Sequence, residues 1–303
     1  MLTGLSAFPL TPFAADGTVD ERAFSGLVDR LVAAGVDSIA PLGSTGSYAY
    51  LRPEERARVA RLAVEHADGI PVMIGIGATR TRDVLALAED AQKAGASAVL
   101  LAPVSYQTLT AEDVYGLYED VTRELSVPLT VYDNPGTTHF TFTEQLYQAI
   151  ATLPNVASIK IPGVPADPAA AKAHVDRLRA LLPPHVTLGV SGDAYGTAGL
   201  LAGCDAWYSV IGGTLPQPAL TITRAVQSGD AAAALTESAR LQPLWDLFAE
   251  HGGSLRVIAV IAEHLGLVTA PALPRPIRGL SAAARAGVAD VIERLGLTGR
   301  GAL

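Results

Sequence analysis

The sequence predicts an α/β fold, a (β/α)8 TIM barrel followed by a C-terminal helical appendage. Short apolar runs alternate eight times with longer amphipathic segments along the chain of 303 residues. Each run and the helical segment after it span about 30 residues, which is the length of a strand–helix–strand unit. The runs are continuously apolar, as are parallel strands that helices cover on both faces. Eight such units are typical of a barrel.

The eight predicted strands are short segments of apolar, often β-branched residues. They begin at Leu5, Ser38, Pro71, Ala98, Pro128, Val156, Thr187 and Ala206. The predicted helix after the third strand has start signals over Thr79–Asp83 and a stop signal at Gly95. After about Leu220 no strand-like run follows. We therefore expect a barrel over residues 1–222 and a three-helix extension, residues 223–303, that packs on it.

An open doubly wound sheet is the alternative architecture. Such a sheet usually carries a glycine-rich phosphate turn after its first strand. The segment Thr11–Ala14, which follows the first predicted strand, contains no glycine. The barrel is therefore favoured.

Composition limits the classes of function. The chain is 49% apolar and has a mean hydropathy of +0.30, but no run approaches the roughly 18 apolar residues of a membrane span. The net charge of −8, without a basic run, argues against nucleic acid as a partner. The single cysteine, Cys204, excludes an internal disulfide. Because Leu5–Leu10 looks like a first strand rather than a signal segment, we expect a cytoplasmic protein.

Lys160 is one of only three lysines, and it lies in the apolar run Val156–Pro162. Burying an ammonium costs free energy unless the group is paired or its pKa falls. A lysine that is partly neutral near pH 7 is a nucleophile, typically used to form a Schiff base with a carbonyl substrate. On this segment alone, an edge-strand lysine with its head group in water is an equal alternative.

Small and polar residues follow several other predicted strands, at the end of a barrel where active sites form. They are the segments Gly43–Ser47, Tyr132–Gly136, Ser191–Asp193 and Ser209–Gly213. Singly, such segments are common turns. Together with Lys160 they supply an amine nucleophile, a phenol for proton transfer, and neutral donors for a carboxylate. An imine-forming lyase needs these parts.

This combination resembles the dihydrodipicolinate synthase and N-acetylneuraminate lyase family of pyruvate-dependent class I aldolases, over essentially the whole chain. Four motifs carry the resemblance. Gly43–Gly46 resembles the G-[ST]-T-G-E loop of the family, and Tyr132–Pro135 resembles its Y-N-x-P motif. Lys160 resembles the lysine of its sixth strand, and Ser191–Asp193 matches its S-G-D motif. The three-helix tail also agrees with this family.

The resemblance implies roles for individual residues. Lys160 would form a Schiff base with pyruvate or another 2-oxo acid, Tyr132 would transfer protons, and Ser44 would relay the tyrosine proton. The implied substrate-binding residues are Gly43, Thr45, Gly46, Ser105, Tyr106, Thr137, Ser191, Asp193 and, through its main-chain carbonyl, Tyr208. The resemblance further implies no cofactor and a homo-oligomer, a dimer or tetramer, acting on a 2-oxo acid and an aldehyde or sugar-acid partner.

The chain departs from the family pattern at several positions. Ser47 stands where a glutamate is usual, and Asp133 where an asparagine is usual. Thr137 occupies the position at which dihydrodipicolinate synthases carry an arginine for the carboxylate of the second substrate. The second tyrosine of the family, which reaches across a dimer interface, falls at Ser105 or Tyr106. These changes are compatible with Schiff-base chemistry but argue against a true dihydrodipicolinate synthase.

The second substrate determines the reaction. The residues expected to face it are Ser105, Tyr106, Thr137, Thr138, His139, Asp193 and Tyr195. All except His139 are neutral or acidic, which suggests a hydroxylated rather than a strongly anionic acceptor. We expect a 2-oxo-3-deoxy sugar acid or a 4-hydroxy-2-oxo acid, in C–C cleavage, condensation or dehydration.

Three other functions are alternatives: dihydrodipicolinate synthase itself, a phosphate-sugar barrel enzyme, and a non-catalytic barrel that binds a 2-oxo acid. Ile211–Thr214 after the eighth strand could bind phosphate, but no arginine or lysine follows before Arg224. The six histidines lack the spacing of metal ligands, so we expect no metal site.

Overall fold

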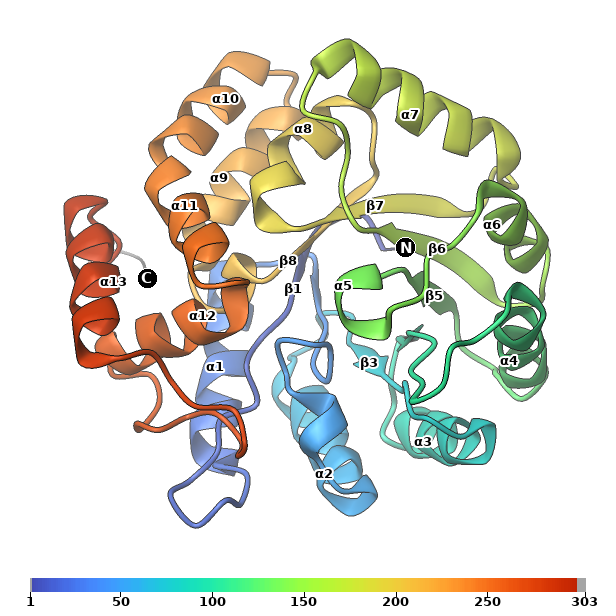
Figure 1. Cartoon of the computed structure of the whole chain (residues 1–303), viewed down its shortest axis with the longest axis horizontal. Helices are drawn as coiled ribbons and strands as arrows, with labels where there is room; N and C mark the ends of the chain where they lie inside the picture. The colour runs from blue at the N-terminus through green and yellow to red at the C-terminus, as the bar shows by residue number, and fades with distance from the viewer. Residues whose placement is uncertain (1, 299–303) are drawn as a thin grey trace.

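The computed structural model describes residues 2–298, and they form the predicted barrel (Figure 1). Its strands are β1 (Gly4–Ala7), β2 (Ser38–Ile39), β3 (Met73–Gly75), β4 (Ala98–Leu101), β5 (Leu129–Tyr132), β6 (Val156–Ile161), β7 (Thr187–Ser191) and β8 (Ala206–Ser209). They pair in parallel in the order β2-β1-β8-β7-β6-β5-β4-β3. A parallel bridge between Ile39 and Val72 joins β2 to β3 and closes the barrel. The predicted fold class is confirmed, and each predicted strand overlaps an observed one.

Helices follow the strands and cover the outside of the barrel (Figure 1). They are α1 (Glu21–Ala34), α2 (Pro53–His66), α3 (Thr81–Lys93), α4 (Ala111–Arg123), α6 (Glu144–Ala151), α7 (Pro168–Leu181), α8 (Gly196–Leu201) and α9 (Pro216–Gln227), and a single turn, α5 (Pro135–Thr138), follows β5. Local chemistry fixes the helix starts. Asp20 accepts a hydrogen bond from the Ala23 N–H at the start of α1. Thr110 and Asp113 cap each other's backbone N–H at the start of α4.

The described chain continues after α9 with α10 (Ala231–Arg240), α11 (Gln242–Glu250), α12 (Ser254–His264) and α13 (Ala282–Arg294). In Figure 1 these helices stand together beside the barrel, and α12 packs against both α11 and α13. This part was expected to hold three helices. It holds one more because Pro243, in the first turn of α11, cannot continue the hydrogen bonds of α10.

The expected boundary after residue 222 falls inside α9. A division of the chain into a barrel and an extension therefore stays a proposal, and the end of α9 is its natural place. Residues 1 and 299–303 of the expected ranges lie outside the described residues.

The inside of the barrel is packed with side chains from the strands, as in other barrels of this size. This inner cluster comprises Leu2, Phe8, Ala40, Met73, Ala98, Leu100, Ala102, Tyr132, Ala206 and Tyr208. The rings of Phe8 and Tyr208 meet edge to face with their centroids 6.0 Å apart. The inner cluster thus places three aromatic rings, those of Phe8, Tyr132 and Tyr208, inside the barrel.

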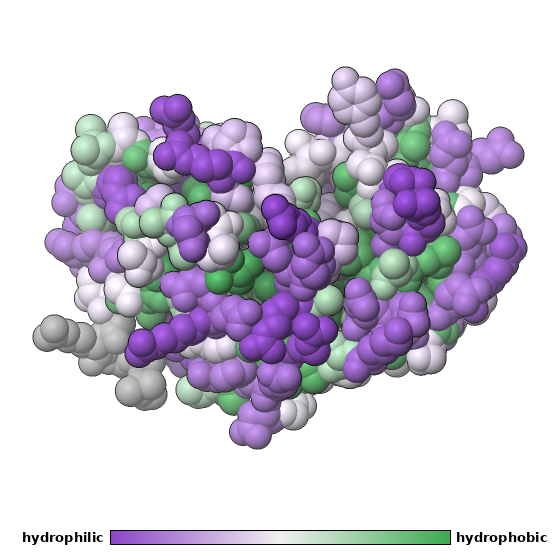
Figure 2. All heavy atoms as spheres, turned by 90° about the horizontal axis from the view of Figure 1, so that it is seen from below, coloured by the Kyte–Doolittle hydropathy of each residue, from purple (hydrophilic) through white to green (hydrophobic). Residues whose placement is uncertain are grey.

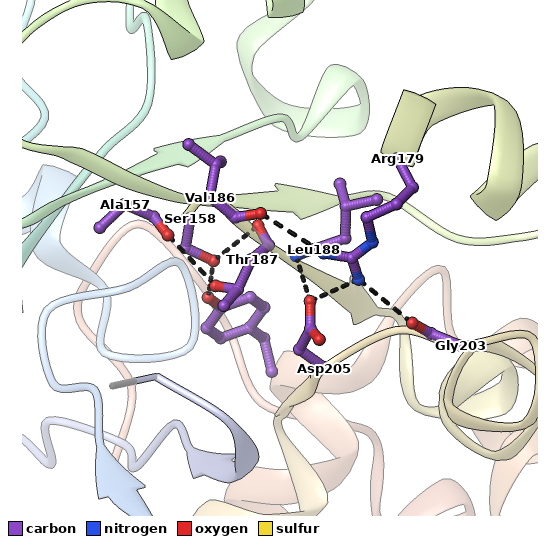
Figure 3. Close-up of polar contacts among 9 residues, drawn as sticks. Ala157, Ser158, Arg179, Val186, Thr187, Leu188, Gly203 and Asp205 are labelled. Carbon is purple, nitrogen blue, oxygen red and sulfur yellow. Dashed lines mark hydrogen bonds and ion pairs between the residues drawn. The ribbon is translucent and has the colours of Figure 1, made fainter. Parts of the chain in front are cut away.

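Polar contacts join β6, β7 and the start of β8 (Figure 3). The Asp205 carboxylate accepts a hydrogen bond from the Leu188 N–H at 2.8 Å and is paired with Arg179 at 2.5 Å. The hydroxyls of Tyr208 and Ser158 lie 2.6 Å apart inside the barrel. These contacts hold the strands in register and fix the Tyr208 ring in place.

The surface seen in Figure 2 is mainly hydrophilic, and apolar side chains show only in separate patches. The same view shows the molecule hollowed at its upper edge, between two raised sides. Within residues 2–298 no helix is long and apolar enough to cross a membrane.

Candidate active site

A cavity of about 640 Å³ opens among residues that follow the carboxyl ends of the strands, which is where barrel active sites form. Segments after β2, β5, β6, β7 and β8 line the cavity, and so do the first turn of α12 and Ile277. The lining includes Ser44, Thr45, Tyr132, Asn134, Thr137, Thr138, Lys160, Ser191, Tyr208, Ser254, Leu255 and Arg256. Barrel strands therefore build the floor of the cavity, and the C-terminal helices contribute to its rim.

Lys160 reaches the cavity from β6, yet only 5% of the residue is exposed. Its Nζ lies 4.1 Å from the centroid of the Tyr132 ring, 5.6 Å from that of Phe8 and 6.0 Å from that of Tyr208. Aromatic faces attract a cation, but they solvate it far less than water does. The alternative of an edge-strand lysine with a solvated head group is therefore excluded.

The surroundings of Lys160 change its protonation. Burial lowers the pKa of this amine to about 7, while the negative charges of Asp193 and Asp133 act in the opposite direction. A substantial fraction of the amine is therefore neutral near pH 7. A neutral amine beside a cavity can attack a carbonyl carbon.

The Tyr132 hydroxyl belongs to a triangle of polar groups. Its oxygen lies 3.2 Å from Ser44 Oγ. Asn134 Nδ2 donates to Tyr132 Oη at 2.9 Å and to Ser44 Oγ at 3.2 Å. Because the amide donates to the phenol oxygen, the phenol proton can point toward Ser44 or into the cavity. Burial raises the pKa of Tyr132, against the effect of the hydrogen bonds from Ser44 and Asn134, so the phenol is a proton donor near neutrality.

The loop Gly43–Ser47 offers donors for an anion. The backbone N–H groups of Ser44 and Thr45 have no hydrogen-bond partner in the described part of the chain, and both residues line the cavity. A Cβ at Gly46 would lie 2.8 Å from the backbone nitrogen of Leu42, so the tight folding of the loop requires glycine. Free N–H groups and hydroxyls in a turn of this kind can bind a carboxylate.

Asp193 lies beneath the cavity rather than on its wall. Its carboxylate accepts hydrogen bonds from Ser209 Oγ at 2.9 Å, the Val210 N–H at 3.1 Å and the Ile211 N–H at 2.8 Å. Burial raises its pKa to about 6, although these donors and the charge of Lys160 favour ionisation. With three donors already bound, Asp193 joins the ends of β7 and β8 and places a negative charge near Lys160.

Asp133, the other acidic residue near Lys160, accepts a hydrogen bond from the Tyr147 hydroxyl. Its second carboxylate oxygen is buried and has no partner among residues 2–298. Burial raises the pKa of Asp133. The substitution of aspartate for the usual asparagine therefore adds a buried charge without adding a contact to the cavity.

The structure brings together most of the residues expected at the site. Lys160, Tyr132, Ser44, Thr45, Thr137, Thr138, Ser191 and Tyr208 line the cavity, and Gly43 and Gly46 lie in the loop that carries Ser44 and Thr45. Ser105, Tyr106, His139 and Tyr195 are not among its lining residues in the described chain. Tyr106 is 95% exposed, so nothing within residues 2–298 covers it.

Two parts of the site were not expected from the sequence. Asn134 was interpreted as part of a turn, and its place two residues after Tyr132 is the only local signal for its role. Arg256 lies far along the chain, in a helix that starts after a glycine pair, and its own segment carries no signal. The sequence predicts that His139 is the only residue facing the second substrate that can carry a positive charge. The structure corrects this expectation, because Arg256 lines the cavity.

The fold and the cavity define a class of protein: a (β/α)8 barrel that presents a buried lysine from its sixth strand and a tyrosine from its fifth at the carboxyl end of the barrel. The model of the dihydrodipicolinate synthetase family matches residues 1–295. The chain belongs to this family, as the sequence motifs predicted.

Individual relatives match most or all of the chain. It is 32% identical to a 4-hydroxy-tetrahydrodipicolinate synthase of Phenylobacterium zucineum (strain HLK1) over 300 residues, which are 98% of each chain. It is 31% identical over 242 residues, 77% of each chain, to the putative 2-dehydro-3-deoxy-D-gluconate aldolase YagE of Escherichia coli (strain K12).

Solved structures of the family superpose closely on this one. A dihydrodipicolinate synthase from Agrobacterium tumefaciens str. C58 is 47% identical, with a TM-score of 0.93 over 97% of this chain and 98% of that one. YagE in complex with pyruvate is 27% identical, with a TM-score of 0.90 over 98% of this chain and 99% of that one. Synthases and an aldolase both occur among these relatives, so membership alone does not select the reaction.

Proposed function

We propose that this chain is a class I aldolase or lyase in which Lys160 forms a Schiff base with pyruvate or another 2-oxo acid. The observation that carries the proposal is a buried amine at the floor of a cavity, 4.1 Å from the centroid of the Tyr132 ring, whose pKa burial lowers to about 7. The pyruvate bound to YagE supports the choice of a 2-oxo acid. We further propose that the protein is cytoplasmic and acts as a dimer-based homo-oligomer.

The proposed reaction begins when the neutral amine of Lys160 attacks the C2 carbonyl and water leaves. The protonated imine withdraws electrons from the C3–C4 bond. In cleavage this bond breaks, the aldehyde departs, and an enamine is left on Lys160. Tyr132 takes the proton of the C4 hydroxyl and delivers one to C3, with Ser44 as relay. Hydrolysis of the imine releases the 2-oxo acid, and condensation is the reverse sequence.

The C1 carboxylate would bind to the loop after β2. The free N–H groups of Ser44 and Thr45 and the Thr45 hydroxyl are the donors proposed for it. Neutral donors suit this place because a second cation beside Lys160 would disfavour protonation of the imine.

We propose a 2-oxo-3-deoxy sugar acid or a 4-hydroxy-2-oxo acid as the substrate. Asn134, Thr137 and Thr138 offer amide and hydroxyl groups along the cavity for its hydroxyls. Dihydrodipicolinate synthesis is the alternative that the Phenylobacterium relative favours by name. Thr137 offers only a hydroxyl, and no carboxylate lines the cavity in the described chain to receive the ammonium of aspartate semialdehyde, which argues against this alternative.

A phosphate site after β8 is the weaker alternative. A Cβ at Gly213 would lie 2.1 Å from the Phe8 carbonyl oxygen, and the Gly212 N–H donates to Ser209 Oγ at 2.9 Å. Close packing against the first strand therefore accounts for the glycine at 213 without a phosphate. A non-catalytic barrel would not need the Tyr132–Ser44–Asn134 triangle.

Trapping with borohydride tests the proposal. Pyruvate with borohydride should add one reduced adduct per chain in intact mass, and peptide mapping should place it on Lys160. Lys160→Arg should abolish the adduct, because arginine keeps the charge but cannot become a neutral nucleophile. Lys172→Arg, an exposed lysine paired with Asp176, is the matched control and should label like the wild type. An unlabelled wild type, or an adduct on Lys93 or Lys172, would contradict a Schiff base on Lys160.

A further inference from the structure

Arg256 is a cation at the rim of the cavity, contributed by the C-terminal helices. It is an exposed residue in the first turn of α12 and lines the cavity together with Ser254 and Leu255. Its Nε donates to the Arg278 carbonyl at 3.0 Å. In the described chain it pairs with no carboxylate, so both terminal nitrogens of the guanidinium are available.

The charges on the cavity wall are of one sign. Lys160 and Arg256 are its charged lining residues within residues 2–298, and no aspartate or glutamate is among them. The lining also includes neutral amide and hydroxyl groups, among them Asn134 and Thr137. Such a wall is complementary to a ligand that carries one anionic group near the lysine and a second one at the rim.

The size of the cavity agrees with a ligand longer than pyruvate. Its volume of about 640 Å³ lies within the range of roughly 300–1,000 Å³ that is typical of sites for ligands much larger than a three-carbon acid. Pyruvate bound through Lys160 and the Ser44–Thr45 loop would leave the part near Arg256 empty. The rest of the cavity is therefore available to the second substrate.

We propose that Arg256 is a specificity-determining residue that binds a terminal carboxylate on the second substrate. The proposal rests on the Schiff-base function and names its substrate class: a 4-hydroxy-2-oxo acid with a second carboxylate at the far end, built from pyruvate and an aldehyde acid. Because Nε is held by Arg278, the two terminal nitrogens present the planar pair that matches a carboxylate.

The same features select against other groups. A phosphate is usually bound by a cluster of cations or by a cradle of N–H groups, and the rim has a single arginine in the described chain. An ammonium on the aldehyde would find no carboxylate among the described residues of the wall. Hence the favoured acceptor is an aldehyde with a carboxylate and no amine.

Condensation of pyruvate with matched aldehydes tests the proposal. The acceptors are succinic semialdehyde against butanal, and glyceraldehyde 3-phosphate against glyceraldehyde, at saturating pyruvate. The full-length wild type should have its highest kcat/KM with succinic semialdehyde. Arg256→Gln should lower that value about 10- to 100-fold, mainly through KM, because a hydrogen bond to a charged group is lost. The kcat/KM of Arg256→Gln for butanal should equal that of the wild type. Arg256→Lys should recover part of the kcat/KM lost for succinic semialdehyde.

Arg22→Gln is the matched control, since Arg22 is an exposed arginine on α1 outside the cavity. It should leave both aldehydes unaffected. An equal loss for succinic semialdehyde and butanal in Arg256→Gln would assign Arg256 a structural role and overturn the proposal, as would a wild-type preference for butanal or for the phosphorylated aldehyde. Borohydride labelling distinguishes failure of the Schiff-base function from failure of the role of Arg256. An unlabelled wild type refutes the Schiff-base function. A wild type that is labelled normally but does not prefer succinic semialdehyde to butanal refutes only the role of Arg256.

Discussion

Tyr132 and Lys160 are register partners on neighbouring strands, β5 and β6, and the lysine Nζ lies 4.1 Å from the centroid of the tyrosine ring. Side chains of register partners point to the same face of a sheet. A slip of one residue would turn one of the two away from the cavity. The sheet itself, rather than a mobile loop, therefore sets the distance between the proposed nucleophile and the proposed proton donor.

Tyr132→Phe should keep borohydride trapping of pyruvate but lose about 10²- to 10⁴-fold in kcat, because the variant removes proton transfer and leaves the amine in place. Steady-state cleavage of the true substrate, with pyruvate release as readout, measures this loss. Tyr115→Phe is the matched control, since Tyr115 lies on α4 outside the cavity. Near wild-type turnover in Tyr132→Phe would contradict the assigned role.

The rate of imine formation should rise with pH through about 7 and then level off, because the nucleophile is the deprotonated amine of Lys160. The negative charge of Asp193 raises the pKa of Lys160 and so opposes burial. Asp193→Asn should therefore move the midpoint of this profile to lower pH, by roughly one pH unit. Single-turnover adduct formation, followed across the neutral range, measures the midpoint.

A control is needed for Asp193→Asn, since this carboxylate also accepts three hydrogen bonds. Thermal unfolding of the variant should stay cooperative. A folded variant whose midpoint does not move, or moves to higher pH, would show that Asp193 does not set the protonation of Lys160.

Aspartate semialdehyde should condense with pyruvate very slowly or not at all. Arg256 offers a cation at the rim for the carboxylate of this aldehyde, but no carboxylate lines the cavity in the described chain to receive its ammonium. Thr137 adds one hydroxyl rather than a second bidentate guanidinium. Thr137→Arg should raise this activity above the wild-type level, and Thr137→Gln, which adds bulk without charge, should not. Efficient condensation by the unmodified protein would return dihydrodipicolinate synthesis to first place.

Arg56 should be important for stability. Only 5% of the residue is exposed, and it donates to the carbonyls of Gly77 and Gly75, both at 2.8 Å. Arg56→Met leaves these carbonyls without donors and should lower the free energy of unfolding by about 2–4 kcal/mol. Urea denaturation measures the change. Arg58→Met, on the same helix, removes an exposed pair with Glu21 and should change stability little. Equal midpoints for the two variants would contradict this account.

The fold was predictable because its signal is local. Each strand is a continuous apolar run, and burial on both faces leaves such a run whatever its neighbours are. Lys160 was predictable for the same reason, since an ammonium inside an apolar run conflicts with its surroundings. The number of helices after α9 was harder to predict from the sequence, because the amphipathic pattern continues on both sides of the break at Pro243.

The site was predictable only where its residues follow strands. Tyr132 and Ser44 stand at strand ends, and the topology brings these ends together. Asn134 has two possible roles in the sequence, turn former and hydrogen-bond donor, and only the positions of Tyr132 and Ser44 decide between them. Arg256 comes to the cavity through the packing of α12, which no local pattern specifies. A role for the exposed Tyr106 at an interface stays a prediction.

The origin of the cavity wall in two different parts of the chain has an evolutionary consequence. The proposed nucleophile and proton donor stand on strands, where a substitution disturbs the register of the barrel, whereas Arg256 stands on a helix that begins after two glycines. Mutations in this helix can therefore replace one acceptor by another while the amine and the phenol keep their geometry. A lineage of such barrels can diversify its substrates by sampling the helix start, without passing through a non-functional ancestor.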